Sequence, residues 1–356
     1  MVTLRFPQQF FLYALLALLF SLALSPVIAA LARRVGLIDV PGRAPHKQHQ
    51  EPTPLAGGTV LMLGVIVLSS VFGLWREAPV RSIVFSSILI YLFGLLDDAR
   101  GLSAFPKLFG QLVAGLWLIS SGFSVHFIES IAGSVLSKPV TAWLDLGLTL
   151  FWLVGVTNAM NMIDSMDGLA AGLSAITFLF LLPVTLASNQ VALTALSVIL
   201  LGICIGLYYN NVTPARLFLG DSGAQTLGFL AASIAMVYAP SGLHPAVSWF
   251  VPILLVAIPI FDTTLVTVSR LRRGAPIYRA GRDHLYHRLV QFGMSPGRAV
   301  ITIHVVAILV DCLAFVALIL SPLAANLVFV GVLAIGGIAL IGLERAFRLE
   351  LSEKTK

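Results

Sequence analysis

Residues 10–32 read FFLYALLALLFSLALSPVIAALA, a run without a single charged side chain. A helix needs about 20 predominantly apolar residues to cross a bilayer, so this run predicts a membrane-spanning helix. The run is longer than the apolar part of a typical signal peptide, and its strongest positive charges, Arg33 and Arg34, follow it rather than precede it. We therefore expect an uncleaved span whose N-terminal end lies outside.

The composition of the whole chain agrees with this first run. Of the 356 residues, 58% are hydrophobic and only 11% are charged, whereas a soluble domain has about 25% charged residues. The sequence thus predicts an all-α polytopic membrane protein in which residues 1–356 form a single transmembrane domain. Further apolar runs bring the expected number of transmembrane helices to about eleven. They are residues 10–32, 56–74, 82–96, 108–128, 141–160, 169–187, 191–209, 223–240, 247–269, 299–320 and 324–343.

The third run is short, and we expect its helix to continue into the polar residues that follow.

The distribution of positive charge predicts the orientation of the protein. Of the Lys and Arg residues, only Arg5, Arg76, Arg81 and Lys138 fall on segments that this topology places outside. All others fall on inner segments, as the positive-inside rule requires, so we expect the C-terminus in the cytoplasm. The same rule explains the net charge of +6 without a nucleic-acid partner.

The remaining polar residues are clustered, and each cluster follows an odd-numbered run. Ionisable groups at membrane depth are costly and usually mark function. We therefore expect one convergent site at the cytoplasmic face. Its candidate members are Asp97, Asp98, Asn158, Asn161, Asp164, Asp167, Asn210, Asn211, Asp221, Asp283, His284, His287 and Arg288.

The carboxylates in these clusters suggest a hard cation. Adjacent Asp97 and Asp98 repel each other or recruit a cation, and Lys107 is available to balance them or to bind an anion. A solvated loop is the structural alternative. Asn161, Asp164 and Asp167 follow a spacing of i, i+3 and i+6, so we expect them on one helix face. Three oxygen ligands on one helix face favour a Mg²⁺ site. A structural role, as helix caps, is the alternative.

Two further motifs suggest phosphate. Glycines flank Asp221 and Ser222 in residues 218–223, where they would let the backbone approach a phosphate or a metal, although a helix N-cap is the alternative. His284, His287 and Arg288 lie at i, i+3 and i+4 among several arginines, which favours a phosphate clamp over zinc. Oxygen ligands, cations and a membrane position together suit phosphoryl transfer from a soluble donor to a lipid.

At these residues the sequence resembles the polyprenyl-phosphate N-acetylhexosamine-1-phosphate transferases. The matching motifs occur in order and cover about residues 36 to 290. They are residues 36–41, Lys47 to His49, residues 52–58, Asp97-Asp98 with Lys107 and Gln111, residues 158–169, Asn211 with residues 218–223, and residues 284–289.

The resemblance implies transfer of a sugar-1-phosphate, most simply GlcNAc-1-phosphate, from a UDP-sugar to undecaprenyl phosphate. UMP leaves, and the product is the first lipid-linked intermediate of a cell-envelope glycan. It implies Mg²⁺, with Mn²⁺ as a substitute, held by Asn161 and Asp221. It also implies Asp97, Asp98 and Asp164 as catalytic residues. The implied substrate-binding residues are Lys47, His49, Lys107, Asn158, Ser165, Met166, Asp167, Asn211, Phe218, His284, His287 and Arg288.

The sequence departs from the family pattern at two positions. Ser165 stands where Gly is usual, and Tyr286 stands where a third His is usual. The box at residues 284–289 therefore lacks the three consecutive His of the branch that uses UDP-MurNAc-pentapeptide. This favours UDP-GlcNAc or a related N-acetylhexosamine, and UDP-MurNAc-pentapeptide stays the alternative donor.

The remaining expectations concern partners and rival classes. An ion-coupled transporter is the main rival, but its charges should lie near the bilayer midplane, often in repeats. We expect an inner-membrane, multi-pass enzyme whose partners are its two substrates and the bilayer. A homodimer stays open.

Overall fold

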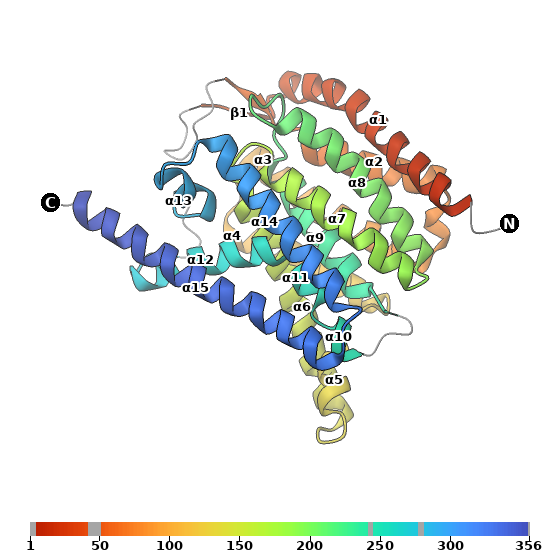
Figure 1. The fold of residues 1–356 in the computed structure, drawn as a ribbon. Coiled ribbons are helices and arrows are strands. Elements are labelled where there is room, and N and C mark those ends of the chain that lie inside the picture. The colour runs from red at the N-terminus through yellow and green to blue at the C-terminus, as the bar shows by residue number, and fades with distance from the viewer. Residues whose placement is uncertain (1–4, 42–50, 241–244, 277–280, 355–356) are drawn as a thin grey trace. The chain divides into compact units, whose positions relative to one another are not determined.

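The computed structural model describes residues 5–41, 51–240, 245–276 and 281–354 (Figure 1). These residues form two compact units, which are described separately. Unit 1 consists of the described residues up to 240, and unit 2 of those from 245 onward. The sequence treats both as one catalytic domain, and that interpretation stays a prediction.

Unit 1 is helical apart from a two-residue antiparallel ribbon, in which Ile38 faces Pro54 and Asp39 faces Thr53. Its elements, in chain order, are α1 (Arg5–Arg34), β1 (Ile38–Asp39), β2 (Thr53–Pro54), α2 (Gly57–Val71), η1 (Leu74–Arg76), α3 (Ala78–Arg100), α4 (Ala104–Ser120), α5 (Phe127–Ala132), α6 (Lys138–Ile163), α7 (Leu169–Ala187), α8 (Val191–Asn211) and α9 (Gly220–Val237).

Helix α9 is the centre of unit 1. Every residue from Ser222 to Ala235 is buried, because α2, α3, α6 and α7 all pack against this helix. A helix that is apolar on all sides has no polar face to turn to solvent, so it is stable only inside a bundle. The N-terminal end of α9 is therefore held from several directions, and the candidate site forms there.

A second layer of unit 1 is built on α8, which packs between α1 and α7 (Figure 1). Gly202 and Gly206 of α8 are spaced as in the small-residue motif of membrane helix pairs. A side chain at Gly202 would place its Cβ 2.4 Å from the Ala14 carbonyl oxygen. The absence of side chains at these glycines is what allows α1 to approach.

Unit 2 contains the described remainder of the chain. Its elements are α10 (Pro245–Ser248), α11 (Val251–Leu254), α12 (Ala257–Arg272), α13 (Leu285–Gln291), α14 (Pro296–Ala317) and α15 (Pro322–Lys354). The predicted span 247–269 is therefore wrong as one helix. Pro252 and Pro259 lie in the first turns of α11 and α12, where proline is tolerated because those N–H groups have no partner within the helix. The apolar run is thus divided into short helices.

The all-α, polytopic membrane architecture is confirmed. Among the described residues, seven helices are long and apolar enough to span a membrane, and α2 and α4 are shorter apolar helices. The expected extension of the third run is also confirmed, because α3 continues through Asp97 and Asp98 to Arg100. This extension presents two carboxylates at the end of an otherwise apolar helix.

Candidate active site

Three helix ends meet at the start of α9 in unit 1. The end of α3 supplies Asp97 and Asp98, the start of α4 supplies Lys107, and the first turn of α9 supplies Asp221. These residues lie up to 124 positions apart in the chain, yet hydrogen bonds join them directly. The expected convergence of these sequence clusters is therefore seen within unit 1.

The Asp98 carboxylate lies against the N-terminus of α9. Its Oδ1 accepts the Asp221 N–H at 2.7 Å, and its Oδ2 accepts the Ser222 N–H at 3.1 Å and the Ser222 hydroxyl at 2.6 Å. Gly220, at φ +70°, permits this contact, because a Cβ there would lie 2.5 Å from Asp98 Oδ2. The motif glycine thus lets an internal anion approach the positive end of the helix, where negative charge is stabilised.

Lys107 connects the other two carboxylates. Its Nζ pairs with Asp97 and lies 2.5 Å from Asp221 Oδ2. Asp97 also accepts the Leu102 N–H at 2.6 Å and is buried. Of the two roles considered for Lys107, charge balance is therefore the one seen in the structure. It balances Asp97 and Asp221, however, rather than the adjacent pair Asp97-Asp98.

Asp164 adds another carboxyl group to this cluster. Burial and the neighbouring carboxylates of Asp221, Asp167 and Asp98 together raise the pKa of Asp164 to about 8. At pH 7 Asp164 is therefore largely protonated, and Lys107 alone does not allow every carboxyl group of the cluster to ionise. Such a cluster favours an added cation, which would allow all of its members to ionise.

The expected common helix face of Asn161, Asp164 and Asp167 is wrong. Helix α6 ends at Ile163, and Asp164 is its C-cap with ψ 54°, outside the helical range. The chain then turns through Ser165, whose N–H donates to the Ile163 carbonyl at 2.7 Å. Only Asn161 is helical, and it hydrogen-bonds to Asp221. The polar residues before Gly168 therefore end α6 earlier than the i, i+3, i+6 spacing predicted.

Asn158 belongs to a cluster of three amides next to the carboxylates. It exchanges hydrogen bonds of 2.7 and 3.2 Å with Gln111, which in turn donates to Gln225 Oε1 at 3.0 Å. The sequence analysis did not select Gln225. An amide inside the apolar run 223–240 was the signal that could have found it, because polar groups at that depth need partners.

Several of the predicted substrate-binding residues hold two turns together. Asn211 is buried; its Oδ1 accepts the Gly168 N–H and its Nδ2 donates to the Leu217 carbonyl, both at 3.0 Å. Asp167 accepts the Thr213 hydroxyl at 3.1 Å. Asn211 thus fixes the turn that contains Ser165, Met166 and Asp167 relative to the segment that leads to Phe218.

Phe218 is fixed by its backbone. Its N–H donates to the Pro54 carbonyl, and its own carbonyl accepts the N–H groups of Ala56 and Gly57. The sequence motif at residues 52–58 therefore joins the motif at residues 218–223. Lys47 and His49, predicted to bind substrate, lie outside the described residues.

The candidate residues of unit 2 gather around α13. His284 lies immediately before this helix, and its Nδ1 is 2.7 Å from Asp262 Oδ2. The neighbouring Asp283 is clamped by Arg270 and Arg273. Burial alone would raise the pKa of Asp283, but the two guanidinium groups outweigh it and lower that pKa to about 2. A convergence of this box with the carboxylates of unit 1 stays a prediction.

Arg288 has internal partners in the same unit. It is fully buried, its Nη1 lies 3.0 Å from Glu344 Oε2, and its guanidinium stacks on the Phe347 ring at 4.4 Å. His287 differs from it in charge, because burial and the nearby His284 and Arg282 lower the pKa of His287 to about 4. His287 is thus neutral at pH 7, and the phosphate-binding role of both residues stays a prediction.

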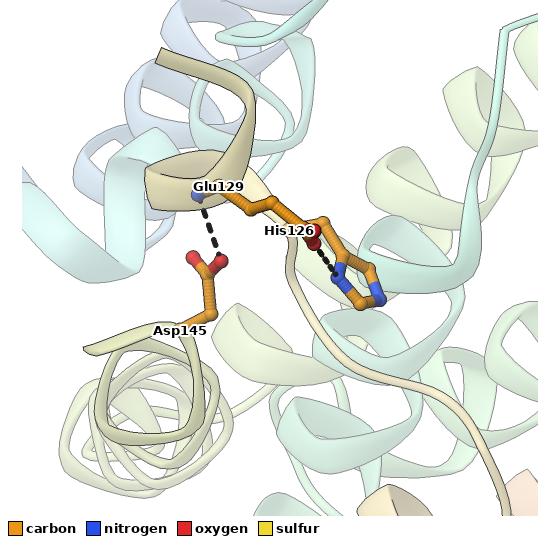
Figure 2. Close-up of side chains that lie close together, drawn as sticks. All are labelled: His126, Glu129 and Asp145. Atoms are coloured by element: carbon orange, nitrogen blue, oxygen red, sulfur yellow. Dashed lines mark hydrogen bonds and ion pairs between the residues drawn. The ribbon is translucent and has the colours of Figure 1, made fainter. Parts of the chain in front are cut away.

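Another group of ligand-type side chains lies elsewhere in unit 1. Figure 2 shows His126, Glu129 and Asp145, whose ligand atoms lie within 4.8 Å of one another. Asp145 accepts the N–H groups of Ile128 and Glu129 at 2.7 and 3.0 Å, and His126 pairs with Glu129 at 3.2 Å. Each member therefore has a protein partner, and Asp145 serves to fix α5 on α6.

Comparisons with known proteins identify the family of the chain. The family model described as "Glycosyl transferase family 4" matches residues 80–239, which include α3, α4, α6 and the start of α9. The chain is 30% identical over 305 residues to the "Probable undecaprenyl-phosphate N-acetylglucosaminyl 1-phosphate transferase" of Bacillus subtilis, covering 85% of this chain and 83% of that one. The chain belongs to glycosyl transferase family 4.

Two further relatives represent two branches. A "Decaprenyl-phosphate N-acetylglucosaminephosphotransferase" of Mycobacterium tuberculosis is 29% identical over 338 residues, covering 88% of this chain and 83% of that one. A "Phospho-N-acetylmuramoyl-pentapeptide-transferase" of Lacticaseibacillus paracasei is 28% identical over 196 residues, covering 52% and 61%. The first likeness extends further along both chains, and the resemblance seen in the sequence is confirmed.

Proposed function

We propose that this chain transfers GlcNAc-1-phosphate from UDP-GlcNAc to a polyprenyl phosphate. An oxygen of the lipid phosphate attacks the β-phosphorus of the donor, the bond from that phosphorus to the bridging oxygen breaks, and UMP leaves. The observation that carries the proposal is the cluster of Asp97, Asp98, Lys107 and Asp221 at the N-terminus of α9. Phosphoryl transfer depends mainly on positioning and charge stabilisation, which such a cluster supplies.

The reaction further requires, in this proposal, a divalent cation such as Mg²⁺, with Mn²⁺ as a substitute. Asp221 and Asn161 would hold it, since their carboxylate and amide oxygens are hard ligands. The donor set fits, because burial and the neighbouring carboxylates together raise the pKa of Asp164, and a bound cation would allow this carboxyl group to ionise. When bound, the ion would neutralise the negative charge that develops on the donor phosphates.

The chain's own residues have separable roles in this scheme. Asp98, which is anchored by α9, orients or deprotonates the lipid phosphate, and Asp97 holds Lys107 in place. The Lys107 ammonium group lies between two carboxylates and is therefore already placed at the site. A donor phosphate can bind it without a large movement of the side chain. His284 binds a donor phosphate, and the turn fixed by Asn211 accommodates uridine.

UMP release tests the activity directly. Purified protein should be mixed with undecaprenyl phosphate, Mg²⁺ and one donor at a time: UDP-GlcNAc, UDP-GalNAc, UDP-glucose or UDP-MurNAc-pentapeptide. We expect UDP-GlcNAc to give the largest kcat/KM. Faster turnover with UDP-MurNAc-pentapeptide would favour the alternative donor, and absence of UMP with every donor would refute the proposal.

Orientation belongs to the same proposal: the protein lies in the inner membrane with its active site facing the cytoplasm. Residues Glu77, Glu129 and Lys138 would then lie across about 30 Å of hydrocarbon from the chemistry. Replacing each of them by Ala should leave turnover within about threefold of the parent, because surface substitutions away from a site change little. A loss above about a hundredfold in a variant that still folds would indicate the inverse orientation.

Asn211→Ala should weaken donor binding. Removing a buried hydrogen bond costs roughly 1–3 kcal/mol, and about 1.4 kcal/mol corresponds to tenfold in Kd. We therefore expect a Kd for UDP-GlcNAc that is about 5- to 150-fold higher, measured by calorimetry. Asn210→Ala is the matched control, since among the described residues Asn210 Nδ2 donates to the Gly206 carbonyl of its own helix. Equal effects of the two variants would contradict the proposed link to the uridine turn.

A further inference from the structure

Asp262 is a buried carboxylate that the sequence analysis did not select. It lies in the middle of α12, and none of its surface is exposed. A charged side chain is almost never fully buried unless it is paired. Two partners account for its position, and both belong to the box at residues 284–289.

The two oxygens of Asp262 contact two different groups. Oδ1 accepts the Leu285 N–H at 2.6 Å, and Oδ2 lies 2.7 Å from Nδ1 of His284. An ionised carboxylate can only accept hydrogen bonds, so the imidazole donates from Nδ1–H. This leaves Nε2 as the ring nitrogen of His284 that can contact a ligand.

From this arrangement we infer that Asp262 is the positioning residue for His284: it holds Nδ1–H so that Nε2 is presented to a phosphate of the donor. The inference rests on the proposed function, in which His284 binds that phosphate. To donate from Nε2 as well, the ring must carry a second proton, and the adjacent carboxylate compensates the resulting positive charge. Asp262 itself does not touch the substrate.

The same two contacts explain how the Asp262 carboxylate and the His284 imidazole can lie so close together. The bond to Leu285 N–H fixes the first turn of α13 to α12, and the bond to Nδ1 fixes the ring relative to that turn. The orientation of the His284 ring, and the nitrogen that faces Asp262, are therefore set by one side chain. Loss of a carboxylate that orients a metal-bound histidine typically costs about 10–100-fold, and we expect a loss of similar size here.

Asp262→Asn separates positioning from mere support of α13. An asparagine Oδ1 can still accept the Leu285 N–H, whereas the charge next to Nδ1 is lost. We expect kcat/KM for UDP-GlcNAc to fall about 10–100-fold, mainly through KM. In a His284→Gln background the same substitution should cost less than about threefold, because residues that act through one another are not additive.

A spectroscopic measurement tests the geometry independently of turnover. In protein labelled with ¹⁵N-histidine, the signal missing from His284→Gln identifies His284. We expect a protonated Nδ1 in the parent and a shift of this resonance in Asp262→Asn.

An unprotonated Nδ1 in the parent, or an equal loss from Asp262→Asn in both backgrounds, would overturn the inference. A parent enzyme that binds UDP-GlcNAc but releases no UMP would refute the proposed function instead. The histidine signal would then still decide whether Asp262 holds the ring.

Discussion

Asp221→Asn should reduce UMP release by at least about a hundredfold, one of the two largest effects that we expect from a single side chain. Asp221 lies in the first turn of α9, where it pairs with Lys107 and hydrogen-bonds to Asn161. An amide is a weaker ligand than a carboxylate for a hard cation, so the variant should also need more Mg²⁺ for half-maximal activity. UMP release measured across a Mg²⁺ titration tests both expectations.

Chelation provides the companion experiment. EDTA should stop turnover of the parent, and Mg²⁺ or Mn²⁺ should restore it. Asp221→Glu is the matched variant, because it keeps the charge and should retain more activity than Asp221→Asn. Full activity in EDTA, or an unchanged Mg²⁺ requirement in Asp221→Asn, would contradict the metal proposal.

Asp98→Asn should lower kcat by about 10²–10⁴-fold, the range associated with a positioned acid or base. Asp98 acts on the lipid phosphate in this proposal, so the affinity for UDP-GlcNAc should stay nearly unchanged. A residue needed only in the transition state lowers kcat without raising KM. Steady-state kinetics and calorimetric titration with UDP-GlcNAc separate the two effects.

The structure requires a control for that variant, because Asp98 also accepts three hydrogen bonds at the start of α9. Ser222→Ala removes one of them and leaves the carboxylate intact. We expect this variant to keep kcat within about tenfold of the parent, since the N–H groups of Asp221 and Ser222 still hold the carboxylate. Equal losses in the two variants would mean that Asp98 supports the helix rather than the reaction.

Local signals in the sequence predicted most of the helices. Apolar runs of sufficient length located the spans, and the carboxylates that follow the third run lie on its continued helix α3. The run 247–269 could not be predicted as three helices from hydropathy alone, because Pro252 and Pro259 are also compatible with a kinked span. In the structure these prolines lie in first turns.

The candidate site could be predicted where its charged residues lie at the edges of apolar runs. Asp97, Asp98, Lys107 and Asp221 were selected as charged groups at the edges of apolar runs, and they do converge. Their pairing was not predictable, because it depends on how α3, α4 and α9 meet.

Residues that act through distant partners were missed for the same reason. Asp262 and Glu344 each lie at the edge of, or within, an apolar run, and their partners are 22 and 56 positions away. A lone ionisable residue in such a run was the available signal, since its burial demands a partner. The identity of that partner came only from the fold.

The central claim is that the phosphate next to the sugar moves with it to the lipid. UDP-GlcNAc carrying a radiolabel on its β-phosphate, incubated with the protein, Mg²⁺ and undecaprenyl phosphate and then extracted with organic solvent, tests it most directly. We predict that the label enters the lipid phase while unlabelled UMP stays in water. Label that remains in water as UDP, with sugar alone in the lipid phase, would contradict the account.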